Sequence, residues 1–125
     1  MVKFFKCNTC GNFVEAIHKT KVPMMCCGKE MEEVVANTVE AAFEKHIPDV
    51  KLDGDTVHVQ VGSTIHPMTE EHYIQWILLE TENGIQRKDL KPNDEPVADF
   101  VIKNDKPISV YAYCNLHGLW KADVK

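Results

Sequence analysis

Beyond residue 48, apolar and polar residues alternate along much of the chain, a pattern that predicts β-strands with one buried face. Residues 57–61 are typical, because valines alternate there with His58 and Gln60. Residues 73–81 are too apolar for a simple edge strand, which predicts burial on both faces at some positions. Further short strands are predicted at residues 50–52, 97–102, 108–114 and 119–124.

Turn residues separate these predicted strands. Asp53-Gly54 and Asn83-Gly84 each follow an alternating or apolar run, and such pairs are strong signals for β-hairpins. Proline, asparagine and aspartate residues lie between the later strands. This spacing predicts a seven-stranded β-sandwich, in which His58, opposite the valines, faces solvent.

The strand predicted at 108–114 ends in a segment that could carry chemistry. The period of two places four residues on an inward face: Ile108, Val110, Ala112 and Cys114. The strand breaks at Asn115, and Gly118 permits a tight loop that turns His117 back toward Cys114. Taken alone, this pair is also compatible with an ordinary buried cysteine and a hydrogen-bonded histidine.

Three further histidines change that interpretation. His46, His66 and His72 lie in loop-like segments, mostly close to proline. With Cys114 and His117 they make five donors, too many for structural zinc and too rich in nitrogen and sulfur for magnesium or calcium. Blue copper would leave two imidazoles unused, whereas iron with one open position fits. A thiolate opposite that position would donate electron density, which suits the reduction of a small molecule.

The N-terminal segment has a separate pattern. Short strands are predicted at residues 3–6 and 13–18, around a Cys7-Asn8-Thr9-Cys10-Gly11 turn that resembles a metal knuckle. Cys26 and Cys27 are adjacent, so a tetrahedral site that includes both should be distorted. We predict a first domain at residues 1–37 and a second at 38–125, with 29–43 as a connecting segment.

Three interpretations of the four N-terminal cysteines are open. They could hold an iron ion through four thiolates, hold a structural zinc ion, or form a vicinal disulfide with two free thiols; we favour iron. A unit this short cannot bury much apolar surface, so metal binding and dimerisation are expected to stabilise it. His18 has no ligand-like neighbour and is expected to be exposed.

Composition and charge bear on the compartment of the protein and on the partners that it can bind. The five cysteines are an odd number and four lie near the N-terminus, which favours metal thiolates in a reducing compartment over a disulfide framework. The net charge of −5, without a basic stripe, argues against nucleic acid as a partner. We find no apolar run long enough to span a membrane and no signal-peptide pattern, and therefore expect a cytoplasmic protein without a membrane partner.

Together these motifs resemble the desulfoferrodoxin family, the two-iron class of superoxide reductases. The resemblance covers the whole chain, from a desulforedoxin-like set of four cysteines to the Glu-Lys-His-x-Pro, His-Pro-Met and Cys-Asn-x-His-Gly-Leu-Trp segments. It implies an all-β protein with a small rubredoxin/desulforedoxin-like metal-binding domain followed by an immunoglobulin-like seven-stranded β-sandwich.

The resemblance also implies two iron centres and their ligands. The first iron would be bound by Cys7, Cys10, Cys26 and Cys27. The second would have four equatorial imidazoles and one axial thiolate, from His46, His66, His72, His117 and Cys114. Glu44 and Lys45 match the residues that the family assigns to the sixth coordination position of the ferric state and to the attraction and protonation of superoxide.

The implied reaction is the one-electron reduction of superoxide to hydrogen peroxide, without release of dioxygen. It requires an external electron donor, for which the resemblance suggests rubredoxin, and a homodimer is the expected assembly. Two alternatives from other classes are a non-catalytic iron protein for electron transfer or metal storage, and a zinc-stabilised β-sandwich adaptor with scattered histidines.

Overall fold

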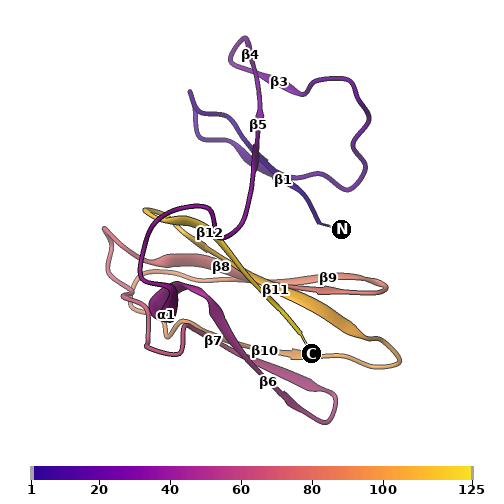
Figure 1. The fold of residues 1–125 in the computed structure, drawn as a ribbon, viewed down its shortest axis with the longest axis vertical. Coiled ribbons are helices and arrows are strands. Elements are labelled where there is room, and N and C mark those ends of the chain that lie inside the picture. Colours follow the sequence, from indigo (N-terminus) through magenta and orange to yellow (C-terminus); the bar gives the residue numbers. More distant parts are fainter. Residues whose placement is uncertain (1, 125) are drawn as a thin grey trace. The chain divides into compact units, whose positions relative to one another are not determined.

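The computed structural model describes residues 2–124, which fall into two compact units, the first ending at Val35 and the second beginning at Ala36. The first unit contains β1 (Phe4–Lys6), β2 (Phe13–Glu15), β3 (Met25–Cys26), β4 (Lys29–Glu30) and β5 (Glu32–Val34). The second contains α1 (Phe43–His46), β6 (Pro48–Asp53), β7 (Thr56–Val61), β8 (Ile74–Thr81), β9 (Gly84–Asp89), β10 (Val97–Val101), β11 (Pro107–Cys114) and β12 (Gly118–Asp123) (Figure 1).

Two small antiparallel sheets make up the described part of the first unit. β1 lies between β2 and β5, and β3 pairs with β4. Phe4 and Phe5 are buried, and the ring of Phe4 lies 5.7 Å from that of Phe13. The prediction that residues 29–43 only connect the domains was wrong for their first part. β4 and β5 lie there, because the backbone of β5 pairs with β1 and completes the sheet.

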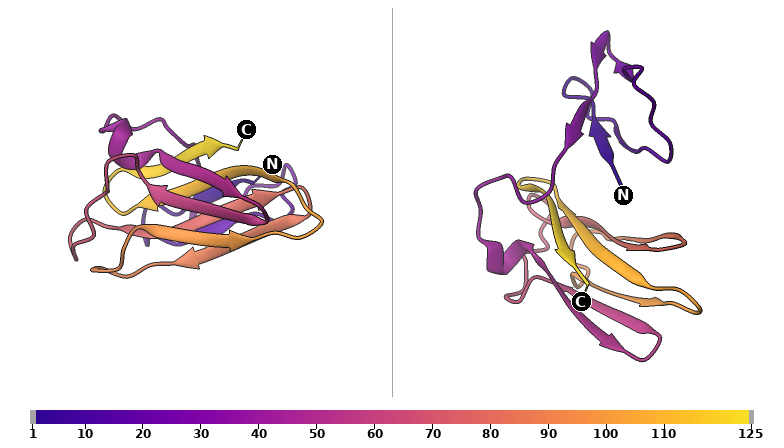
Figure 2. Two further views of the ribbon diagram at one scale, coloured as in Figure 1. Left: turned by 90° about the horizontal axis from the view of Figure 1, so that it is seen from below. Right: turned by 45° about the vertical axis from the view of Figure 1, so that its right-hand side comes forward.

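The second unit is a β-sandwich. Among residues 36–124, seven antiparallel strands form a three-stranded sheet, β10-β7-β6, and a four-stranded sheet, β12-β11-β8-β9. The two sheets lie in separate layers in Figure 1 and Figure 2. The predicted all-β class is confirmed. Both predicted hairpins are present, with Asp53 opposite Thr56 and Thr81 opposite Gly84.

Apolar side chains between the two sheets form the core. Val57, Val59 and Val61 of β7 pack in one cluster with residues of β8 and β11, and Cys114 belongs to it. The predicted inward position of Ile108 was wrong, because the register between β11 and β8 shifts around this residue and leaves it 40% exposed. Tyr111, on the opposite face of β11, is only 4% exposed. β11 is therefore buried on both faces.

The helix α1 lies at one end of the sandwich, and the β6–β7 and β8–β9 turns lie at the other (Figure 1, Figure 2). His46, expected in a loop, is the last residue of α1. Residues 41–45 are mostly good helix formers, and Ile47 is extended because a residue before proline disfavours helical angles. No helix within residues 2–124 is both long and apolar enough to cross a membrane.

Candidate metal centres

The four N-terminal cysteines converge on one point. The Sγ atoms of Cys7, Cys10, Cys26 and Cys27 all lie within 4.8 Å of one another. The Sγ atoms of Cys10 and Cys26 are 3.5 Å apart. All four thiols are free, so the structure gives no support to the vicinal disulfide considered from the sequence. A tetrahedral site for an iron or zinc ion matches this arrangement.

Two turns position these thiols. In the first, the backbone N–H of Cys10 donates to Sγ of Cys7 over 3.4 Å. Such bonds from the amides of Cys10 and Thr9 lower the pKa of Cys7 to about 6. In the second, Cys27 and Gly28 both have left-handed backbone angles, with φ of 54° and 72°, which allows neighbouring cysteines to face the same point.

The four thiols cannot all ionise without a compensating charge. Hydrogen bonds with Cys10, Cys7 and Cys26 raise the pKa of Cys27 to about 12, so a metal-free group keeps a proton there. A bound cation removes this penalty, because it stabilises every thiolate in the group. The donor set therefore fits a metal ion better than it fits four free thiols.

A second group of donors lies at the α1 end of the sandwich. One nitrogen from each of His46, His72 and His117 lies with Sγ of Cys114 in a set spanning no more than 4.8 Å. His66 joins it, because its Nε2 atom lies 3.1 Å from Nε2 of His46. The Nε2 atom of His46 is also 3.1 Å from Nδ1 of His117. The structure thus brings together all five donors predicted for the second metal.

Hydrogen bonds determine which ring nitrogens face the centre of this group. Nδ1 of His46 donates to the carbonyl oxygen of Ala42 over 2.8 Å, and Nδ1 of His66 donates to that of Pro67 over 2.7 Å. A carbonyl oxygen only accepts, so each Nδ1 carries the proton and each Nε2 keeps its lone pair. Such backbone partners are typical of metal-binding histidines, because they fix the tautomer and the ring orientation.

Burial keeps these imidazoles neutral. It lowers the pKa of His66 to about 4, and it is also the main cause of the lowered pKa values of His46 and His72. The Nε2 atom of His72 is buried and has no hydrogen-bond partner among the described residues. Burial raises the pKa of the Cys114 thiol, so a thiolate there requires a nearby cation.

These observations test whether a metal ion fits the second group. Two lone pairs that face each other across 3.1 Å repel unless a cation lies between them, and an unpartnered buried nitrogen is costly. Four imidazoles and one thiolate match the ligand preferences of iron, and iron can retain an open position beside them. The residues present therefore fit an iron ion.

The β11–β12 turn holds two of these donors together. Nδ1 of His117 lies 3.9 Å from Sγ of Cys114, as the predicted tight loop requires, and Gly118 has a φ of 79°. Between them, Asn115 bonds to both neighbours of His72: its side-chain amide donates to the carbonyl of Glu71 and accepts from the N–H of Tyr73. Sequence reasoning missed this contribution of Asn115, because the partners are far away in the chain.

The remaining residues singled out from the sequence lie around or outside the two groups. Glu44 and Lys45 are exposed on α1, next to His46. The positive charge of Lys45 contributes, after burial and the neighbouring histidines, to the lowered pKa of His72. His18 is exposed as predicted, and His58 is exposed on the outer face of β7, where it pairs with Asp99.

Comparisons with known proteins agree with this geometry. Residues 38–123 match the family described as desulfoferrodoxin, and residues 1–34 match the desulfoferrodoxin N-terminal domain. A desulfoferrodoxin homolog from Archaeoglobus fulgidus is 43% identical over 122 residues, covering 98% of this chain and 97% of that protein. A desulfoferrodoxin from Syntrophotalea carbinolica is 44% identical over 122 residues, covering 98% and 96%. The crystal structure of the superoxide reductase from Treponema pallidum has a TM-score of 0.82 and 37% identity, covering 98% of this chain and 99% of that chain.

Proposed function

This chain belongs to the desulfoferrodoxin family, and from that premise we propose that it is a superoxide reductase with two iron centres. It reduces superoxide by one electron to hydrogen peroxide, with uptake of two protons and no release of dioxygen. The observation that carries this function is the convergence of four histidine nitrogens and Sγ of Cys114 on one point, where lone pairs face each other.

The two centres have separate ligands. In our proposal, the first unit forms a desulforedoxin-like domain whose iron is held by Cys7, Cys10, Cys26 and Cys27. Residues 38–125 form the immunoglobulin-like reductase domain, whose iron is held by His46, His66, His72, His117 and Cys114. When bound, the second iron supplies the electron that superoxide accepts, and donation from the thiolate favours this transfer.

Two exposed residues of α1 act on the substrate. Superoxide is an anion and the chain has a net charge of −5, so the field that attracts superoxide has to be local. Lys45 lies between Glu44 and the proposed ligand His46 on α1. Its positive charge acts on the histidine group, because it contributes to the lowered pKa of His72. We assign to Lys45 the attraction of superoxide and the positioning of a proton-donating water. Glu44 is proposed to offer its carboxylate as a sixth ligand in the ferric state.

A direct assay tests this function. Protein loaded with iron should consume more than one superoxide per second centre only while a reductant is present, and should yield one peroxide for each superoxide without dioxygen. Dioxygen released in half the amount of superoxide consumed would instead indicate a dismutase. An excess of zinc over iron in protein purified without added metal would contradict the proposal. So would a spectrum of the second centre that azide leaves unchanged in Glu44→Ala, where no carboxylate competes for the sixth position, because a fully coordinated iron would serve electron transfer or storage.

We propose a rubredoxin-like protein as the electron donor. Exposed apolar side chains lie next to ligands in the chain, at Phe43, Ile65 and Leu116, and Val39 lies beside Gly118 of the β11–β12 turn. Such a group of apolar residues around a redox centre suits a protein partner. Leu116→Ser should slow reduction of the oxidised second centre by reduced rubredoxin, whereas Val101→Ser, at an exposed position on β10, should not. Equal reduction rates in the two variants would contradict docking at this surface.

Assembly and location are proposals of the same kind. A homodimer is supported by the small size of the first unit and by its exposed Ile17 and Val22, which a partner copy could cover. A cytoplasmic location is supported by five free cysteines, which suit a reducing compartment. Light scattering of the iron-loaded protein, with and without Ile17→Asp, tests the dimer. A monomeric mass for the wild type would contradict it.

A further inference from the structure

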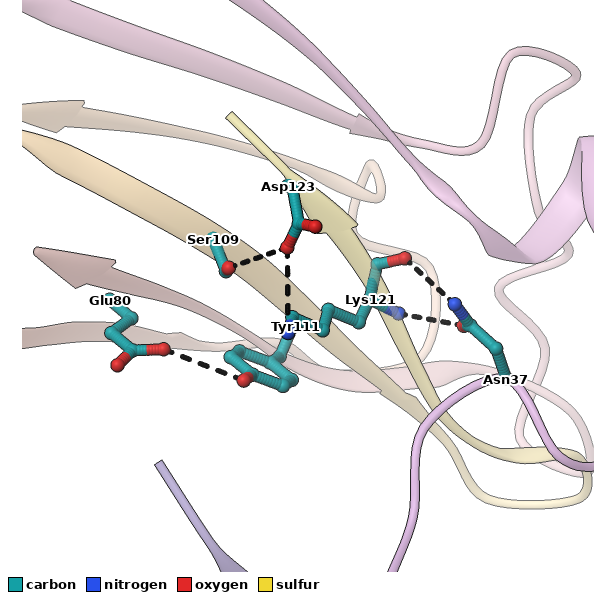
Figure 3. Close-up of polar contacts among 6 residues, drawn as sticks. All are labelled: Asn37, Glu80, Ser109, Tyr111, Lys121 and Asp123. Atoms are coloured by element: carbon teal, nitrogen blue, oxygen red, sulfur yellow. Dashed lines mark hydrogen bonds and ion pairs between the residues drawn. The ribbon is translucent and has the colours of Figure 1, made fainter. Parts of the chain in front are cut away.

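Asn37 is hydrogen-bonded to both neighbours of Trp120 on β12. Its backbone N–H donates to the carbonyl oxygen of Leu119 over 3.0 Å. Its side-chain amide donates to the carbonyl oxygen of Lys121 over 3.1 Å, while the N–H of Lys121 donates to Oδ1 of Asn37 over 2.9 Å. Figure 3 shows the two side-chain bonds. Asn37 thus holds the β12 backbone on either side of Trp120.

This contact replaces a missing neighbour strand. β12 is at the edge of its sheet, so alternate N–H and C=O groups point away from β11 and need other partners. Asn37 supplies three of these bonds from a single residue. Its φ of 61° is in the left-handed region, which asparagine and aspartate tolerate better than most residues. Asparagine therefore suits both the left-handed backbone conformation at position 37 and the hydrogen bonds with β12.

Trp120 lies between Leu119 and Lys121, the two residues to which Asn37 is hydrogen-bonded. It also contacts the second group of metal donors. Its side chain is fully buried, and its indole N–H donates to the carbonyl oxygen of His117 over 3.1 Å. Its ring lies 4.9 Å from the ring of His46, with an interplanar angle of 32°. On another side, its ring meets that of Phe43 edge to face at 5.6 Å. One side chain therefore supports two of the histidines.

We propose that Asn37 and Trp120 are positioning residues for the second iron centre, and this inference rests on the function proposed above. Asn37 fixes the path of β12, β12 fixes the indole of Trp120, and the indole limits the movement of His117 and His46. Neither residue belongs to the nine proposed metal ligands. Groups that hold a ligand in place typically contribute 10- to 100-fold to metal affinity. Because Asn37 acts through Trp120, we expect an effect of about tenfold.

The experiment compares iron-loaded wild type with Asn37→Asp and Trp120→Phe. Aspartate tolerates the same backbone angle and still accepts from Lys121, but it turns a carboxylate oxygen toward the carbonyl of Lys121. Phenylalanine keeps an aromatic ring but lacks the indole N–H. Both variants should release iron from the second centre to a chelator about tenfold faster than the wild type. They should also shift its visible spectrum and its midpoint potential.

Asn104→Asp is the matched control. Asn104 also has a left-handed backbone angle, with a φ of 53°, but lies in the exposed β10–β11 connection. The spectrum of the tetrathiolate centre serves as an internal reference in every sample. Wild-type iron release, spectrum and potential in both test variants would overturn the inference. A lower melting temperature with an unchanged second centre would also overturn it, because a purely structural contact gives that result. A wild type that holds no iron at the second site would contradict the proposed function instead.

Discussion

The Nε2 atoms of His46 and His66 lie 3.1 Å apart, although the hydrogen bonds of both rings place their protons on Nδ1. Two lone pairs at this distance repel each other, and an iron ion held by both nitrogens would replace this repulsion with attraction. Removing the iron should therefore destabilise the second unit. The free energy of unfolding should fall by about 2.7 kcal/mol if free iron had been present at 100 times its dissociation constant.

Thermal unfolding with and without a chelator measures this effect. His66→Ala should abolish most of the iron dependence of the melting temperature of the second unit. His58→Ala is the matched control, because His58 is exposed on the outer face of β7. The same iron dependence in wild type and His66→Ala would show that His66 is not a ligand.

A second prediction concerns Gly62, which lies against the backbone of α1. A Cβ atom at this position would be 2.7 Å from the carbonyl oxygen of Glu44 and 2.9 Å from that of Ile47. Backbone atoms cannot rotate away, so Gly62→Ala should separate α1 from residues 62–66 and cost about 1–3 kcal/mol. His46 and His66 lie on these two segments, and the second centre should lose iron.

Iron analysis and denaturant unfolding of Gly62→Ala test this prediction, with Ser63→Ala as the control. Ser63 is exposed, and its hydroxyl donates a hydrogen bond to the carbonyl of Glu44. Full occupancy of the second centre in Gly62→Ala would mean that the two segments move together without disturbing the histidines.

A third prediction is that the two centres are modular. Cys10→Ser should abolish the tetrathiolate spectrum, because one of four thiolates is replaced by a hydroxyl group. Superoxide reduction at the second centre should continue, since all proposed ligands of that centre lie in the second unit, which begins at Ala36. Parallel measurement of peroxide formation and of iron in each centre tests this. Loss of activity in a variant that retains the second iron would contradict modularity.

A fourth prediction is a dependence of stability on alkaline pH. Burial, together with the nearby carboxylate of Glu80, raises the pKa of Tyr111 to about 12 from its ordinary value of about 10. The Tyr111 hydroxyl donates to this carboxylate over 3.5 Å, and Figure 3 shows the two groups facing each other. The unfolded chain loses the tyrosine proton at lower pH than the folded protein does. The contribution of Tyr111 is therefore complete below pH 10 and is lost as the pH rises toward 12.

Tyr111→Phe should remove this dependence. We expect the free energy of unfolding of the wild type to fall, relative to the variant, by on the order of 2 kcal/mol between pH 9.5 and 11.5. Denaturant unfolding across this range measures the difference between the two proteins. Parallel curves for wild type and variant would show that the folded and unfolded states lose this proton at the same pH.

The fifth prediction concerns Lys45. An ammonium about 7 Å from superoxide, at an effective dielectric constant of about 20, contributes on the order of 2 kcal/mol before screening by salt. Lys45→Ala should therefore slow the capture of superoxide by about tenfold at low ionic strength and weaken its salt dependence. Lys45→Arg should retain most of the attraction. Pulse-generated superoxide at two salt concentrations measures these rates, and equal capture by wild type and Lys45→Ala would exclude steering by this residue.

Local patterns in the sequence were enough to predict most strands of the sandwich, the two hairpins and the donor types, but not β4 and β5. The alternation around Val57 and Val59 follows from the two-residue period of a strand, and the tight loop between Cys114 and His117 follows from Gly118. These features depend on backbone angles and side-chain direction over a few neighbouring residues. Iron was predicted in the same way, because the chemistry of nitrogen and sulfur donors does not require a known geometry.

Tertiary structure alone decided which residues surround those donors. Periodicity predicts which face of β11 is buried, but the shift in register against β8 decided that Ile108 is exposed. The contacts of Asn37 with β12 and of Trp120 with His46 connect residues far apart in the chain. No local pattern in the sequence predicts these contacts, because they depend on how strands pack and on which backbone groups an edge strand leaves unpaired.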